Sequence, residues 1–180
     1  IIIPSDIAYA SKGGYLLETS KITPLASNII SLAYLWNVVR VQGGAYGTGL
    51  VSRASGFTCC YSYRDPNGKE SLKKYEKCGT FLKDYLKENR DLTGFIIGTL
   101  SGLMPLMMPY NIGKYGDLYY FNQKDEKARQ EQLEAILNVE KDELLEIAKE
   151  IDETLEKGGI CIIGGKNQID QCDLDEILSL

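Results

Sequence analysis

The 180-residue sequence predicts an α+β domain with a mixed, largely antiparallel sheet that helices cover on one face. Segments with strand-like alternation are fewer than segments with helical spacing. The two middle strand segments are separated only by "ASG", which indicates a tight antiparallel hairpin. Several helical segments then follow before one last short apolar strand, unlike the regular strand-helix alternation of a parallel fold. We expect residues 1–180 to form a single domain.

The first half of the chain is expected to hold a strand, a buried helix and the hairpin. Residues 6–15 form the strand, which ends near Gly-Gly. The helix is expected at 23–41, with Thr23 as its N-cap and Pro24 at its first position. Apolar residues surround most of this helix, which is typical of a buried one. Those at steps of three and four are Leu25, Ile29, Leu32, Trp36 and Val39.

In the second strand of the hairpin, apolar residues alternate with small polar ones, which indicates that one face of the sheet is covered. The alternating apolar residues are Phe57, Cys59, Tyr61 and Tyr63. Pro, Asn and Gly at 64–68 predict a turn.

The second half is expected to be mainly helical. Residues 70–89 predict one amphipathic helix, and 91–102 another, capped by Asp91. The apolar face of the first is formed by Leu72, Tyr75, Leu82 and Tyr85. Two prolines and several glycines predict a loop at 103–116. The remaining expected elements are helical pieces between about 125 and 157, a strand at 160–164 and a last helical turn at 173–180.

Composition excludes several classes of protein. The net charge of -5 leaves no basic stripe for nucleic acid, and no apolar run is long enough to span a membrane. The five cysteines are odd in number and lack C-x-x-C spacing, so we expect buried free thiols of a reducing compartment. The chain has no histidine, so we expect it to hold no catalytic metal by itself. Its opening without Met suggests a cut point inside a longer polypeptide.

Several suggestive patterns are better explained by structure. "GGAYGTG" and "GGICIIGGKN" lack the flanking elements and spacing of nucleotide-binding loops, so we interpret them as turns. The 12 tyrosines are expected mainly to pack in the core, although a stacking surface is the alternative. The acidic region at 125–157 lacks the spacing of a calcium loop and is interpreted as a solvated helical face.

Arg40 and Tyr46 in "RVQGGAYG" are the candidate functional residues. They flank a turn whose middle, Gly43 and Gly44, has no side chains. A structural explanation is also available: Arg40 could cap the last carbonyls of its helix, and Tyr46 could be the first aromatic residue of a strand. Composition and periodicity alone favour that structural explanation.

The blocks "RVQGGAYG" and "YRDPN", at this spacing, resemble the presequence-peptidase branch of the pitrilysin/insulysin zinc metallopeptidases. The opening "IIIPSDIAYASKGG" is similar to the first strand of the last domain in that family. The resemblance runs from residue 1 to about 116; beyond that only the helix-helix-strand plan agrees. It implies a domain of the pitrilysin/mitochondrial-processing-peptidase type, placed at the C-terminus of a two-half peptidase.

In this family an N-terminal half carries zinc in an H-x-x-E-H motif, and the second half completes the site. The resemblance therefore implies that zinc belongs to the full-length parent and not to this fragment, which alone would be inactive. At the matching positions, Arg40 would hold a substrate carbonyl and Tyr46 would donate a proton to the developing oxyanion. Gly43 and Gly44 would let the substrate backbone lie against the turn.

The expected partners are unstructured peptide substrates and the N-terminal half of the same polypeptide, with no nucleic acid and no membrane. A different class of function stays open, because some relatives of this fold are inactive assembly subunits: a non-catalytic structural module. We expect the parent to work in a bacterial cytoplasm, with an organelle matrix as the alternative.

Overall fold

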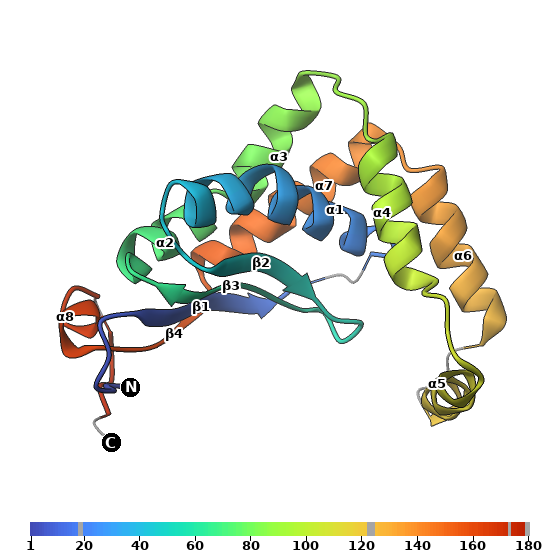
Figure 1. The fold of residues 1–180 in the computed structure, drawn as a ribbon. Coiled ribbons are helices and arrows are strands. Elements are labelled where there is room, and N and C mark those ends of the chain that lie inside the picture. The colour runs from blue at the N-terminus through green and yellow to red at the C-terminus, as the bar shows by residue number, and fades with distance from the viewer. Residues whose placement is uncertain (18–19, 122–124, 173, 179–180) are drawn as a thin grey trace.

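A computed structural model describes residues 1–180 except 18–19, 122–124, 173 and 179–180. Four strands form one sheet in the order β2-β3-β1-β4. Their bounds are Ala8–Tyr15 for β1, Gly47–Ser52 for β2, Phe57–Asp65 for β3 and Gly159–Gly164 for β4. All three strand pairings are antiparallel, and a single parallel bridge joins Ile2 to Gly164 beside them. The α+β fold with a largely antiparallel sheet is confirmed (Figure 1).

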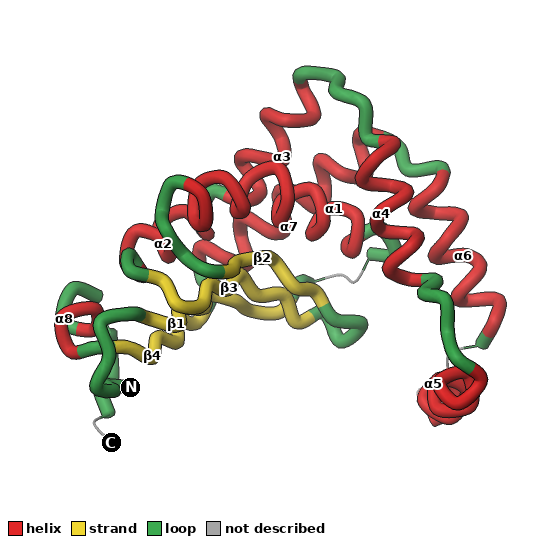
Figure 2. The backbone as a smooth tube through the Cα atoms, in the orientation of Figure 1, coloured by secondary structure: helices red, strands yellow, loops and turns green. Residues whose placement is uncertain are grey.

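Helices form a layer on one face of the sheet (Figures 1 and 2). Those that pack on the sheet or on one another in this layer are α1 Thr23–Ile29, η1 Ile30–Val41, α2 Gly68–Tyr75, α3 Cys78–Lys87 and α7 Lys141–Glu156. A projecting arm follows, made of α4 Thr93–Leu103, α5 Pro109–Phe121 and α6 Glu126–Leu137. The short α8, Lys166–Ile169, lies beyond β4. No helix among the described residues is long and apolar enough to cross a membrane.

Most of the core lies between the sheet and this helical layer, and α6 and α8 each add a residue to it. Its fully buried large side chains are Tyr75, Ile22, Leu25, Ile29, Ile30, Leu35, Leu82, Ile136, Leu144, Ile151, Leu155 and Ile169. Lys12 also points into this layer, where its ammonium pairs with the carboxylate of Glu76. Burial raises the pKa of Tyr34 to about 12, and its hydroxyl donates to the carbonyl of Lys74 at 3.2 Å. These polar groups are thus paired, as a low-dielectric core favours, whereas the hydroxyls of Thr23, Ser71 and Tyr75 are buried without a hydrogen-bond partner among the described residues.

The sequence-predicted helix at 23–41 forms, with Leu25, Ile29 and Val39 buried as predicted, but two of its apolar residues lie outside the core. After Ile29 the chain becomes a π-helix, η1, whose i→i+5 hydrogen bonds widen each turn. The buried positions in η1 are Ile30, Leu35 and Val39, at steps of five and four. Leu32 and Trp36, expected in the core, are exposed. Thr23 is the first helical residue and not the N-cap, a position held by Ile22.

The covered face of β3 is the one opposite to the apolar alternation. Thr58, Cys60 and Ser62 point into the helical layer and are buried. Tyr61 and Tyr63 are exposed on the open face. The prediction of one covered face holds, but the small residues of β3 and not its aromatic ones lie on it. The rings of Tyr61 and Tyr63 instead lie opposite Gly49 and Gly47 of β2.

Several other expectations are corrected by the structure. The segment 70–89 forms two helices, α2 and α3, separated at 76–77. The expected loop at 103–116 is helical from Pro109 onward, since proline is tolerated in a first helical turn. The last helical turn expected at 173–180 is absent over 174–178, the part of it that the structure describes.

The thiols and tyrosines are also less buried than expected. Cys60 and Cys78 are buried, with 3.6 Å between their Sγ atoms, whereas Cys161 is exposed. The exposed tyrosines are Tyr9, Tyr15, Tyr46, Tyr61, Tyr63, Tyr110, Tyr115 and Tyr120. Packing in the core therefore explains only part of the tyrosine content.

Candidate functional site

The C-terminal end of η1 positions Arg40 and is closed by main-chain hydrogen bonds. The amide of Gly44 donates to the carbonyl of Arg40 at 2.9 Å, and the amide of Ala45 donates to Val39 at 3.2 Å. The ammonium of Lys74 donates to the carbonyl of Val38. The last helical carbonyls thus have donors other than the Arg40 guanidinium, so helix capping does not account for this side chain.

Arg40 instead stacks on aromatic rings. Its Cζ lies 4.0 Å from the centroid of the Trp36 ring, one helical turn earlier, and 5.9 Å from that of Tyr46. Trp36 is one of the η1 side chains that lie outside the core. A guanidinium over an indole is held by a cation–π attraction while its N–H groups stay free at the ring edges. Trp36 therefore orients Arg40 towards Tyr46.

Tyr46 directly precedes β2 and leans on the neighbouring strand. Its amide donates to the carbonyl of Tyr63 at 3.2 Å, and the two rings meet edge to face with centroids 5.3 Å apart. A Cβ on Gly47 would lie 2.1 Å from the Tyr63 ring, so this glycine makes room for that ring. The Tyr46 side chain remains 59% exposed. The phenol is thus supported on one side and open to solvent on the other.

The two sequence blocks of the resemblance meet in space. The amide side chain of Asn67, in "YRDPN", donates to the carbonyl of Gly43, in "RVQGGAYG", at 2.8 Å. Asp65 is fully buried and holds the "YRDPN" turn, accepting from Ser62 Oγ at 2.6 Å and from the Asn67 amide at 2.8 Å. Each block therefore fixes the conformation of the other.

The two glycines of the turn occupy different environments. Gly43 is buried, and a Cβ there would meet the carbonyl of Val39 at 2.4 Å. Gly44 is exposed and has a φ of +83°, a left-handed conformation that favours glycine. Gly43 is required by the fold of the turn itself, and Gly44 is the one whose backbone is open to the solvent.

The residues that sequence patterns missed are Trp36 and Tyr63. Both were expected to fill the core, and both instead support the two candidate side chains. A signal for Tyr63 was present, since glycines at 47 and 49 face Tyr63 and Tyr61 across the hairpin, a pairing in which rings cover glycines.

The fold is shared with a solved structure. The chain superposes on a candidate zinc protease from Bordetella pertussis Tohama I with a TM-score of 0.58, covering 90% of this chain and 96% of that one. Sequence identity is 12%, so this likeness concerns the fold alone.

A family model described as the PreP C-terminal domain matches residues 1–166, and the chain belongs to that family, in the presequence-peptidase branch of the pitrilysin-type metallopeptidases. Protein HypA of Clostridium perfringens is 31% identical over 176 residues, and presequence protease 1 of Arabidopsis thaliana, chloroplastic/mitochondrial, is 31% identical over 175. Each match covers 94% of this chain but only 18% and 16% of the relatives. The chain therefore corresponds to a small part of these proteins.

Proposed function

We propose that residues 1–180 form the C-terminal domain of a longer parent protein, a zinc metalloendopeptidase that degrades unstructured peptides. In this proposal Arg40 and Tyr46 bind the substrate and stabilise the oxyanion, while zinc and the general base belong to an N-terminal half of the same polypeptide. The observation that carries the proposal is the exposed Tyr46 phenol beside the Arg40 guanidinium, on a turn that Asn67 makes rigid. Membership of a peptidase family supports it.

The residue types suit this chemistry. When a peptide carbonyl is attacked, negative charge develops on its oxygen, and a phenol hydroxyl can donate a hydrogen bond to that oxygen. One such donor contributes on the order of 3 kcal/mol, or about 10² to 10³ in rate. Arg40 offers a planar set of N–H donors to a neighbouring substrate carbonyl. Because Gly44 is exposed, a peptide backbone can approach the turn between the two side chains.

The residues of this chain do not fit a zinc site. The sequence has no histidine, and the described residues contain no group of three or more cysteine, aspartate or glutamate side chains that could hold a metal ion. Zinc prefers three or four such ligands in tetrahedral array. We therefore assign this chain only the binding of substrate and the donation of hydrogen bonds to it.

A structural module of the same fold is the second candidate. Its support is the apolar, exposed surface of α5, which carries Tyr110, Tyr120 and Phe121 and suits assembly with another surface. The local organisation around Tyr46 favours the peptidase, because Gly47, Tyr63 and Trp36 together hold two polar groups that a scaffold does not need. The presence or absence of H-x-x-E-H in the rest of the reading frame separates the two.

The decisive test is Tyr46→Phe in the parent protein. We expect the turnover rate on an unstructured peptide to fall about tenfold or more, because the variant loses one oxyanion donor and keeps the ring that packs on Tyr63. Stopped or continuous peptide hydrolysis measures the rate, and circular dichroism checks the fold.

Tyr15→Phe is the matched control, since Tyr15 is an exposed phenol at the far end of β1. It should hydrolyse the same peptide at the rate of the wild type. Equal rates for Tyr46→Phe and wild type would reject the role of Tyr46 in the reaction.

The compartment is also proposed and not established. The Arabidopsis relative is chloroplastic/mitochondrial by name, and the clostridial relative comes from a bacterium. We propose the bacterial cytoplasm for the parent, and localisation of a tagged parent protein would test this.

A further inference from the structure

Arg64 has an unusual backbone for an arginine. Its φ is +50°, in the left-handed region that glycine and asparagine adopt far more readily. It lies at a bulge, because Ala8 pairs with Asp65 while Ala10 pairs with Ser62, so that β3 has one residue more than β1 there. Bulges of this kind redirect side chains at the edges of sheets. A long cationic side chain is thus placed where a glycine would be less strained.

The surroundings of Arg64 hold this conformation in place. The next residue, Asp65, is buried and anchored by Ser62 and Asn67 at 2.6 and 2.8 Å. Asn67 in turn is tied to Gly43 in the turn between η1 and β2. The base of the Arg64 side chain is therefore rigid, while the side chain itself is exposed. A backbone that is already fixed removes part of the conformational entropy that would be lost when the side chain binds an anion.

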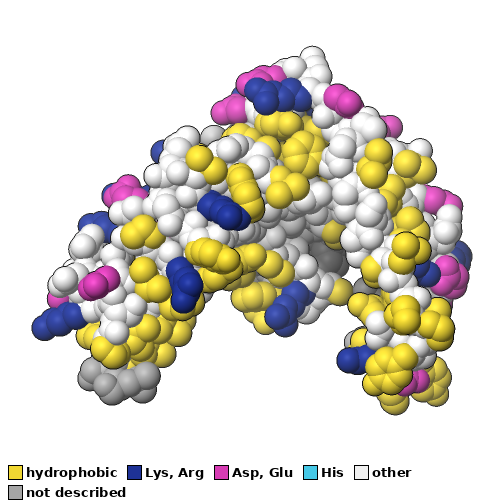
Figure 3. Space-filling model, viewed as in Figure 1, with side chains coloured by type: hydrophobic (Ala, Val, Ile, Leu, Met, Phe, Trp, Pro, Cys, Tyr) yellow, Lys and Arg dark blue, Asp and Glu magenta, His cyan; other side chains and the backbone are white. Residues whose placement is uncertain are grey.

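Arg64 has no anionic partner among the residues that the structure describes, although the chain has 25 acidic and 20 basic residues. In contrast, Arg90 pairs with Glu88 at 2.6 Å and Arg129 with Glu126 at 3.4 Å. In Figure 3, Lys and Arg side chains stand among hydrophobic ones in the middle of the face shown, and Asp and Glu lie around its margin. The guanidinium is thus available to a ligand.

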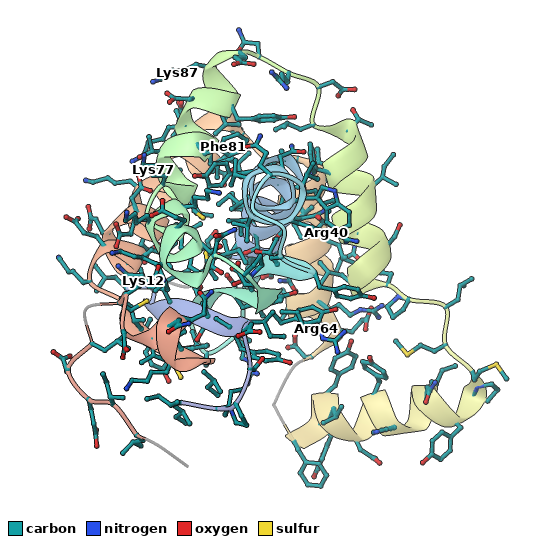
Figure 4. The ribbon with its side chains drawn as sticks, turned by 60° about the vertical axis from the view of Figure 1, so that its left-hand side comes forward. Lys12, Arg40, Arg64, Lys77, Phe81 and Lys87 are labelled. Atoms are coloured by element: carbon teal, nitrogen blue, oxygen red, sulfur yellow. The ribbon has the colours of Figure 1, made fainter. Side chains whose placement is uncertain are left out.

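Arg64 also belongs to the same surface as the candidate site. Tyr63, the preceding residue, packs on Tyr46, whose ring lies below Arg40. Figure 4 shows Arg40 and Arg64 on the same side of the domain, with Lys12, Lys77 and Lys87 on the other side. Two phenols are therefore flanked by two guanidinium groups along one surface.

We propose that Arg64 is a carboxylate-binding residue of this surface and gives the peptidase a preference for peptides that carry a carboxylate near the cleaved bond. The carboxylate is either an aspartate or glutamate side chain or the C-terminal group, since both present the same two oxygens to a guanidinium. This inference rests on the proposed function, which supplies a peptide as the ligand. Arg64 would then select substrates, in contrast to the role of Tyr46 in the reaction itself.

The test compares KM values of the parent protein for four versions of one unstructured peptide. Two versions differ by glutamate or glutamine near the cleaved bond, and two by a C-terminal acid or amide. For wild type we expect KM to be roughly two- to fivefold lower with the carboxylate in one of these pairs, the size expected for an exposed ion pair. The pair that shows the difference identifies the source of the carboxylate. Added salt should reduce the difference.

In Arg64→Gln the ratio of KM for the neutral peptide to KM for the carboxylate peptide should fall to about one. In Arg64→Lys part of the difference between the two KM values should persist, because the charge remains. Arg64→Gly is a second variant that removes the guanidinium and also relieves the strained backbone. It keeps the test valid if Arg64→Gln fails to fold. Arg53→Gln is the control, because Arg53 is an exposed arginine in the turn at the other end of the β2–β3 hairpin. It should keep the wild-type ratio.

An unchanged KM ratio in Arg64→Gln and Arg64→Gly would overturn the inference, and so would wild-type KM values that are equal for all four peptides. Either result leaves the proposed function intact if Tyr46→Phe still loses activity. Failure of the wild-type parent to hydrolyse any of the peptides would reject the proposed function, and the Arg64 inference with it.

Discussion

Gly43 lacks a side chain because the end of η1 occupies the space beside it. A Cβ at this position would lie 2.4 Å from the carbonyl oxygen of Val39, and Gly43 also accepts the hydrogen bond of Asn67. We expect Gly43→Ala to lower the free energy of unfolding by about 1–3 kcal/mol, the cost of forcing atoms into a packed site. Urea unfolding followed by circular dichroism measures this.

Gly116→Ala is the control for that prediction. Gly116 lies inside α5, and nothing lies within 4 Å of the position that its Cβ would take. Alanine should there leave stability unchanged or raise it by up to about 1 kcal/mol, since it favours helix more than glycine does. Equal stability of Gly43→Ala and wild type would show that the turn can relax, and that its close packing is not required.

This packing divides the roles of the two turn glycines. Close packing within the fold is enough to explain why residue 43 is a glycine. Gly44 is a glycine because its φ is +83°, and its backbone is also exposed to solvent. At the scale of single residues, only Gly44 keeps the proposed contact with a substrate backbone. We therefore assign Gly43 the role of shaping the turn and not of contacting the substrate.

The π-helix η1 sets which apolar side chains reach the core. With a wider turn, Leu35 is fully buried and Leu32 is 53% exposed, although the sequence spacing favours the reverse. We expect Leu35→Ala to cost about 2–5 kcal/mol of unfolding free energy, and Leu32→Ala less than about 1 kcal/mol. The same two variants, which delete identical atoms, therefore act as controls for each other in one unfolding experiment.

If Leu32→Ala instead lost more unfolding free energy than Leu35→Ala, residues 30–41 would form an ordinary α-helix and not a π-helix. Comparable losses in both variants would indicate that both side chains are buried in solution. Either outcome would also move Arg40, because its place over the Trp36 ring depends on the same helical period.

At the scale of elements, local patterns predict much of the fold. The hairpin, the two helices after 125 and the last strand follow from turn residues and periodicity, and α7 begins with a capping box between Glu140 and Glu143. Features that depend on hydrogen bonding or packing between elements do not follow. The π-helix is not encoded in a simple repeat, because apolar residues surround most of the segment 23–41. In β3 the alternation is present, but the side with Tyr61 and Tyr63 is the exposed one.

At the scale of the whole molecule, the candidate site combines residues from distant parts of the sequence. Arg40 and Tyr46 are suggested by a resemblance between sequence blocks, and their roles remain proposals. Trp36, Tyr63 and Arg64 acquire meaning only once β3 pairs with β2 and places "YRDPN" beside the end of η1. Periodicity is a local property, so it cannot show which turn will meet which helix end.

The surface of the molecule suggests that the chain works as one wall of a larger site. The surface carries the guanidinium groups of Arg40 and Arg64, several exposed aromatic rings and the open face of the sheet. Figure 3 shows that the molecule is hollowed between the sheet and the arm that carries α5. The chain also spans less than a fifth of the relatives that it matches. In the proposed function, Arg40 and Tyr46 would act together with the zinc and general base of an N-terminal half.

We therefore expect the isolated 180-residue chain to fold but to be inactive. Its folding is expected because the chain contains the core between the sheet and the helices, as well as β1, which pairs with both β3 and β4. Its inactivity is expected because it has no histidine to hold zinc and no assigned general base. Circular dichroism should show the helical content of the structure, elemental analysis should find far less than one zinc per chain, and an unstructured test peptide should remain intact. The parent protein, assayed beside it with the same peptide, is the control for substrate quality. Stoichiometric zinc in the purified chain together with hydrolysis that a chelator abolishes would contradict the division of labour between the two halves, since the chain would then carry a complete site of its own.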